Sequence, residues 1–275
     1  MKTTRHPLAC STVGTQREVV SLHFGPTDRG RKAYIQAALH ADEAPGLLVA
    51  TKLRERLAAL ESEGKLNAEI VLVPVANPIG LAQWIDHSHI GRFELRNGDN
   101  FNRHYPDLAA AVAGKIESKL SASEGENTAL IRRALVEAAS EVHAVSELES
   151  LRKTLLTLAA DANIALDLHC DSEALMHLYT ATPVWERVDP LARYLGAVAS
   201  LLETTSGDYP FDEACSRTWW QLRERFPAHP IPMGCASVTI ELRGNTDVDH
   251  ALAAKDADAI VAYLAHQGLI TIDVP

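Results

Sequence analysis

Short apolar runs alternate along the chain with longer amphipathic segments. Several runs are rich in β-branched residues and many are bounded by turn-forming residues, which is typical of β-strands. Several are also apolar at consecutive positions, as expected for strands that are covered on both faces. The predicted strands span residues 19–25, 33–40, 69–76, 163–169, 176–181, 198–205 and 237–242.

Between these runs, apolar positions recur in steps of three and four, which predicts amphipathic helices. Residues 47–60 form one such helix, and residues 249–267 form the last, with Gly268 as its C-cap. Residues 127–160 continue the same spacing over many turns. We interpret this segment as a long helical insertion packed on a globular body. A coiled-coil arm is the alternative, because the mixed steps fit both periods.

The alternation of strands and helices predicts a single α/β/α sandwich domain over residues 1–275, with a mostly parallel or mixed sheet. No internal repeat, low-complexity tract or linker divides the sequence. In such sheets functional residues gather where strands end and loops begin. The strand ends are therefore where candidate chemistry is expected.

Composition and charge disfavour some classes of function. Hydrophobic residues make up 47% of the chain, the net charge is −10 and the pI is about 5.6. This acidic balance disfavours non-specific binding to nucleic acid or to an anionic membrane. No apolar stretch approaches the length of a signal peptide core or a membrane span. A homo-oligomer is possible, because an acidic protein with a long amphipathic helix could dimerise.

The cysteines point to a reducing compartment. Cys10, Cys170, Cys215 and Cys235 are widely spaced and form no CxxC pair. In a chain of this length, that pattern is typical of reduced thiols. With no apolar leader at the N-terminus, it predicts a cytoplasmic protein.

Candidate metal ligands stand at two predicted strand ends. His40 ends the strand 33–40, Glu43 follows three residues later, and His169 ends the strand 163–169. Two histidines and one carboxylate leave a fourth position on zinc open, as in catalytic sites. Asp167 shares a strand face with His169 and is expected to orient its imidazole without binding the metal itself. The competing interpretation is that these are ordinary core or surface histidines.

A long loop, residues 77–107, follows the strand 69–76 and is rich in arginine and asparagine. Its planar guanidinium groups suit a carboxylate or a developing oxyanion. We therefore interpret the loop as a substrate clamp, with a solvated basic loop as the alternative. The residues concerned are Arg92, Arg96, Arg103, Asn77, Asn97, Asn100 and Asn102.

Glu241 lies inside the predicted strand 237–242, where a buried glutamate requires a partner. It is a candidate general base, and Arg243 on the same face is a candidate substrate-binding residue. An exposed ion pair between Glu241 and Arg243 is the competing explanation. Three further acids near the histidines are interpreted as solvated loop residues, with a second metal as the alternative; they are Asp42, Asp171 and Glu173.

Taken in order, five short motifs resemble the zinc carboxypeptidase superfamily and, within it, the succinylglutamate desuccinylase/aspartoacylase branch. The resemblance covers roughly residues 30–245. The motifs are His40-x-x-Glu43, Asn77-Pro78-x-Gly80, Asn102-Arg103, Asp167-Leu168-His169 and Glu241 in the run TIEL.

The resemblance implies a role for each matching position and a three-layer α/β/α sandwich around a mixed, twisted sheet. His40, Glu43 and His169 match the ligands of one zinc ion (Zn²⁺) per chain, and Glu241 matches the general base. Asn102 and Arg103 match the residues that grip the substrate carboxylate. Arg92 or Arg96 could match the arginine that polarises the scissile carbonyl; the spacing does not choose, and the Gly91-Arg92-Phe93 turn slightly favours Arg92.

Two departures from the family stand out. The usual acid-Leu-Asn-Arg motif reads Asn100-Phe101-Asn102-Arg103, so an acid is missing. The chain is also expected to lack the small β-rich C-terminal domain that many relatives carry.

The expected activity is zinc-dependent hydrolysis of an amide bond in an N-acyl amino acid or short peptide that bears a free carboxylate. The expected partner is therefore a small molecule or short peptide, with no nucleic acid and no membrane. Two alternatives remain open. One is a metallocarboxypeptidase acting on peptides, and the other is a non-catalytic, metal-stabilised carboxylate-binding protein.

Overall fold

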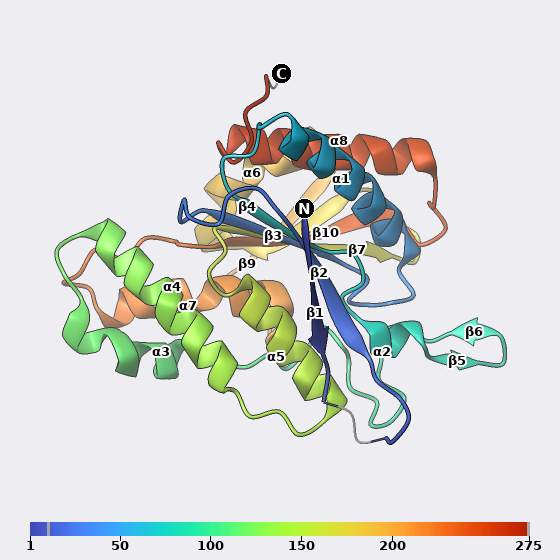
Figure 1. Ribbon diagram of the computed structural model, residues 1–275, viewed down its shortest axis with the longest axis horizontal. Helices are drawn as coiled ribbons and strands as arrows, with labels where there is room; N and C mark the ends of the chain where they lie inside the picture. Colours follow the sequence, from blue (N-terminus) through green and yellow to red (C-terminus); the bar gives the residue numbers. More distant parts are fainter. Residues whose placement is uncertain (10–11, 274–275) are drawn as a thin grey trace.

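The structure, a computed structural model, describes residues 1–9 and 12–273 and is built around one eight-stranded sheet (Figure 1). The strand order is β1-β2-β4-β3-β7-β10-β8-β9. Its members are β1 (Lys2–Pro7), β2 (Glu18–Phe24), β3 (Lys32–Ala37), β4 (Glu69–Val73), β7 (Ile164–Asp171), β8 (His177–Ala181), β9 (Ala199–Glu203) and β10 (Ala236–Gly244).

The sheet is mixed and mostly parallel, as the sequence predicted. The pairs β3–β4, β3–β7, β7–β10 and β8–β9 are parallel. The pairs β1–β2, β2–β4 and β8–β10 are antiparallel. Since β3, β7 and β10 run the same way, their carboxyl ends meet at one edge of the sheet.

Helices cover both faces, which confirms the three-layer sandwich (Figure 1). One layer comprises α1 (Ala44–Ser62), α6 (Trp185–Leu195) and α8 (His250–His266). The other comprises α3 (Ala109–Ile116), α4 (Glu124–Glu141), α5 (Glu147–Ala159) and α7 (Phe211–Arg225). Short elements complete the chain: α2 (Pro78–Leu81), the hairpin β5 (Trp84–Ile85) and β6 (Ser88–His89), and the 3₁₀ turns Glu117–Lys119 and Thr182–Val184.

Alternation along the central strands separates apolar from polar faces. In β7, Leu166 and Leu168 belong to the core under α1, α6 and α8. Asp167 and His169 alternate with them and therefore face the opposite layer. In β10, the same pattern turns Glu241 toward that layer. The polar residues of the central strands thus share the face that α7 helps to cover.

The segment 127–160 is two helices, so the prediction of one long helix is wrong. Helix α4 ends at Glu141 and α5 begins at Glu147. The break is caused by a capping box, in which Ser146 accepts from the backbone of Glu149 and the Glu149 carboxylate accepts from the backbone of Ser146. Both helices pack on the body through one core, which includes Ile131 and Leu148, as predicted.

Three buried cysteines, Cys170, Cys215 and Cys235, are free thiols. Cys10 lies outside the described residues. Within the described part of the chain, every helix is too short or too polar to serve as a membrane span.

Candidate metal centre and active site

The three predicted metal ligands converge on one point. Glu43 bridges the histidines, with its Oε1 2.8 Å from His40 Nδ1 and its Oε2 2.9 Å from His169 Nδ1. All three side chains are buried. Their ligand atoms lie within 4.8 Å of one another, and they form the one such cluster among residues 1–9 and 12–273. The acids considered for a second metal form no comparable group.

The positions of the histidines differ in detail from the prediction. The strand β3 ends at Ala37, so His40 lies in the turn beyond it, and His169 lies inside β7 rather than at its end. The chain leaves β3 through Ala38, whose φ of 58° is unusual for a residue other than glycine. The turn brings Glu43 to the start of α1 and toward His169.

Two tethers hold this turn in place. The Asn77 side chain donates to the Leu39 carbonyl at 2.9 Å and also accepts from the backbone of Gly80 at 2.8 Å. The backbone of Ala41 donates to the Gly91 carbonyl at 3.1 Å. The Asn-Pro-x-Gly motif seen in the sequence thus positions the segment that carries the first histidine.

The second ring nitrogen of each histidine also faces an acceptor. His40 Nε2 is 2.9 Å from Asn100 Oδ1, and His169 Nε2 is 2.9 Å from the Asp167 carboxylate. These contacts hold the Nε2 protons and turn both Nδ1 atoms toward Glu43. Asn100 was not predicted in this role. The sequence placed it only in the loop rich in arginine and asparagine, at the position where the family motif has an acid.

This arrangement fits a metal cation. A neutral imidazole carries one N–H, yet each ring faces acceptors at both nitrogens. Burial opposes a charged His169, but Asp167 and Glu43 outweigh it and raise the pKa of His169 well above its usual value. Burial likewise opposes ionised Glu43, but His169 and His40 bring its pKa far below the usual range. A divalent cation at the Nδ1 atoms would supply the positive charge that the cluster requires.

A cavity of about 640 Å³ opens onto the cluster and is lined by His40, His169 and Glu241 among others. Glu241 is the register partner of His169 on the neighbouring strand. Its Oε2 atom is buried and receives no hydrogen bond within the described chain. Burial raises the pKa of Glu241, His169 lowers it and Glu43 raises it further, with a net upward shift. A carboxylate in this state is suited to accept a proton.

The predicted arginines separate into two groups. Arg92 lines the cavity and donates to Glu43 Oε1 at 3.1 Å. Arg103 and Asn102 also line it, and Arg103 donates to the Asn102 carbonyl at 2.7 Å. Arg96 is exposed outside the cavity lining. Arg243 likewise lies outside the lining and is paired with Asp256 of α8.

Comparison with known proteins bears on the same residues. The family model described as the succinylglutamate desuccinylase/aspartoacylase catalytic domain matches residues 29–145. Over this segment the chain is similar to the catalytic domain of that family, and the structures described below support the same assignment. The matched segment includes His40, Glu43 and the loop with Arg92 and Arg103. The expected resemblance is confirmed.

Solved structures agree with the family over the whole chain. A protein predicted to be a succinylglutamate desuccinylase/aspartoacylase from Shewanella frigidimarina NCIMB 400 is 28% identical, with a TM-score of 0.87 over 99% of this chain and 73% of its own. A family protein from Shewanella amazonensis SB2B is 29% identical, with a TM-score of 0.85 over 100% and 74%.

A more distant structure shares the fold. A protein predicted to be a metallopeptidase, also from Shewanella amazonensis SB2B, is 15% identical, with a TM-score of 0.60 over 98% of this chain and 87% of its own. No protein of curated function matches the sequence. The family match and these relatives indicate a hydrolase or deacylase, and His40, Glu43 and His169 form a group that could hold a metal ion.

Proposed function

We propose that the protein is a zinc-dependent amide hydrolase acting on an N-acyl amino acid or a short peptide with a free carboxylate. The observation that carries this proposal is the placement of Glu241 beside the His40–Glu43–His169 cluster, at one end of a cavity that arginines also line. A carboxylate base, a metal-ligand set and cationic groups are the parts that amide hydrolysis requires.

His40, Glu43 and His169 would hold the zinc ion through two imidazole nitrogens and a carboxylate. When bound, zinc would supply Lewis-acid activation of the scissile carbonyl and of water. Asn100 and Asp167 would keep the two imidazoles in the ligating orientation through their Nε2 contacts.

Glu241 is proposed to move the proton. Its carboxylate accepts a proton from water as the water oxygen forms a bond to the carbonyl carbon. It then returns that proton to the amide nitrogen as the C–N bond breaks, which yields a carboxylic acid and a free amine. The free Oε2 atom and the raised pKa of Glu241 support this role.

Arg92 and Arg103 are proposed to bind charge on the substrate. We assign the developing oxyanion to Arg92, rather than to Arg96, because Arg92 lines the cavity and contacts Glu43. Arg103, with Asn102, would orient the free carboxylate through the planar guanidinium fork. Arg243 has no proposed role at the substrate, since its guanidinium is paired with Asp256.

Substitution of the proposed base tests the function. Glu241→Gln is expected to retain about one zinc per chain by elemental analysis and to lose 10²-fold or more in kcat toward N-acyl amino acids. The matched control is Glu173→Gln, an exposed glutamate outside the cavity lining, which should keep full activity. An active Glu241→Gln protein, or hydrolysis that survives complete metal removal, would contradict the mechanism.

A further inference from the structure

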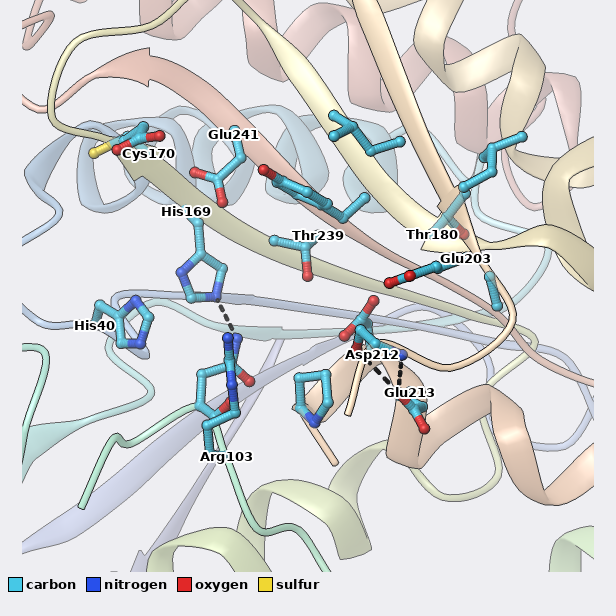
Figure 2. A pocket seen from close by; sticks show the side chains of 18 of the residues that line it. His40, Arg103, His169, Cys170, Thr180, Glu203, Asp212, Glu213, Thr239 and Glu241 are labelled. Atoms are coloured by element: carbon cyan, nitrogen blue, oxygen red, sulfur yellow. Dashed lines mark hydrogen bonds between the residues drawn. The ribbon is translucent and has the colours of Figure 1, made fainter. Parts of the chain in front are cut away.

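The cavity continues well beyond the cluster of His40, Glu43 and His169. Figure 2 shows His40, His169 and Glu241 toward one end, and Thr180, Glu203 and Asp212 toward the other. Asp212 lies in the first turn of α7, and Glu203 is the last residue of β9. The second end is thus formed by elements that supply no metal ligand.

This distal end carries negative charge that no side chain of the described residues neutralises. Neither Asp212 nor Glu203 belongs to an ion pair in residues 1–9 and 12–273. The adjacent Glu213 differs, because Arg217 pairs with it at 2.5 Å and Ser206 donates to it. A carboxylate lining a cavity without a counter-ion is complementary to a cation that enters from outside.

The surroundings of Asp212 destabilise its ionised form as long as no cation lies beside it. Burial raises its pKa to about 7, the charge of the nearby Asp167 adds to the shift, and the backbone N–H of Glu213 opposes it. Asp167 itself is fully buried and receives no donor from the described chain other than the contact of its carboxylate with His169. A cation beside Asp212 would relieve the repulsion that these acids create.

A metal ion is a poor candidate for this cation. The described residues bring three metal-ligand side chains together at His40, Glu43 and His169, and Asp212 and Glu203 are outside that group. An organic cation requires fewer ligands and can be held by one or two carboxylates through charge-assisted hydrogen bonds.

Positively charged side chains and the distal carboxylates lie at opposite ends of the cavity. Arg92 contacts Glu43 at the metal end, and Arg103 is bonded to Asn102, whose side chain lies 3.5 Å from His169. The cationic groups therefore lie near the metal cluster, and the unpaired carboxylates lie at the far end. A ligand that matches both ends has a carboxylate and a cation in one molecule.

We propose that Asp212, assisted by Glu203, selects substrates whose carboxylate-bearing part also carries a cationic side chain, as in N-acyl derivatives of basic amino acids or short peptides that end in one. This inference rests on the proposed function, since it assumes that the scissile amide lies at the His40–Glu43–His169 end. The cavity volume of about 640 Å³ suits a ligand of that size.

The test compares substrates that differ in the charge of the side chain. The zinc-loaded protein is given Nα-acetyl-L-lysine, Nα-acetyl-L-norleucine, which lacks the ammonium group, and Nα-acetyl-L-glutamate. We expect kcat/KM for the lysine derivative to exceed that for the norleucine derivative by roughly 10- to 100-fold. Asp212→Asn should bring this ratio close to one. Equal use of both derivatives, or a preference for the glutamate derivative, overturns the proposal.

Two further variants complete the design. Glu224→Gln, an exposed acid on the same helix, should leave the ratio as in the parent protein. If Asp212→Asn does not fold, the exposed Glu203→Gln is expected to lower the ratio several-fold. A ratio that is unchanged in Asp212→Asn, or in Glu203→Gln when that variant replaces it, overturns the assignment.

Binding distinguishes failure of this inference from failure of the proposed function. Calorimetric titration of the zinc-loaded Glu241→Gln protein should show tighter binding of the lysine derivative than of the norleucine derivative. This preference without hydrolysis by the parent protein would contradict the proposed function and keep the charge selectivity. Hydrolysis without any charge preference would contradict only the selectivity, and absence of binding by every derivative would contradict both.

Discussion

At the scale of single residues, substitution of Arg103 is expected to affect substrate binding more than the chemical step. Arg103→Ala should raise KM by about 10- to 100-fold with a smaller effect on kcat, because a carboxylate grip acts alike in the ground and transition states. Steady-state kinetics with a good substrate measure this split. Arg54→Ala, an exposed arginine on α1, is the control and should change neither constant. A loss confined to kcat would place Arg103 at the reacting atoms instead.

The residues of the candidate site were predictable where a short motif identifies them. His40, Glu43, His169 and Asp167 could be found because ligand type and spacing are visible along the chain. The contact of Asn100 with His40 could not be predicted, because an amide in place of an expected acid gives no positive signal. Only the structure shows that the Asn100 side chain lies next to the His40 ring. Likewise, the pairing of Arg243 with an acid on another helix leaves no trace in the local sequence.

At the scale of secondary-structure elements, the turn between β3 and α1 depends on close approach of the backbone at Gly91. An added Cβ there would overlap the backbone nitrogen of Asp42 and lie 2.7 Å from the carbonyl carbon of Ala41. Gly91→Ala should therefore displace the turn that carries His40 and lower zinc affinity at least tenfold, measured by competition with a chelator.

The matched control for that change is Gly114→Ala in α3, where an added Cβ meets no atom within 4 Å. It should be neutral or stabilise the fold by up to about 1 kcal/mol, because alanine is the better helix former. Unaltered zinc affinity in Gly91→Ala would show that the turn can move without loss of the site.

Elements were predictable where apolar periodicity is strong and local signals agree with it. The seven predicted strands all occur. Most of them are buried, and buried strands need apolar residues at almost every position, whereas β9 is largely exposed. The edge strand β1 was missed, since most of its residues are exposed and carry no such pattern. The break between α4 and α5 was missed although Ser146 and Glu149 have the spacing of a capping box. Helical periodicity continued across the break and concealed it.

At the scale of the whole molecule, the layers were predictable and the cavity was not. Alternating strands and helices specify which element types must cover one another. The cavity, in contrast, is lined by β7, β9, β10, the loop with Arg92 and the start of α7. Its shape and its separation of charge depend on how these segments, which are far apart in the sequence, pack together. No local sequence pattern predicts that packing. The proposed preference for a cationic side chain therefore depends on the structure, whereas the expectation of an N-acyl amino acid or short peptide came from the sequence.

The metal cluster joins the turn after β3 to strand β7, so zinc should stabilise the whole fold. A ligand that binds only the folded state at 100 times its Kd contributes about 2.7 kcal/mol, which corresponds to a rise in Tm of roughly 5–10 °C for a chain of this size. Calorimetry with and without a chelator measures this shift. Glu43→Gln should abolish it, whereas Asp171→Asn, which alters an exposed acid of the cavity lining, should preserve it. A full shift in Glu43→Gln would place the stabilising metal elsewhere in the molecule.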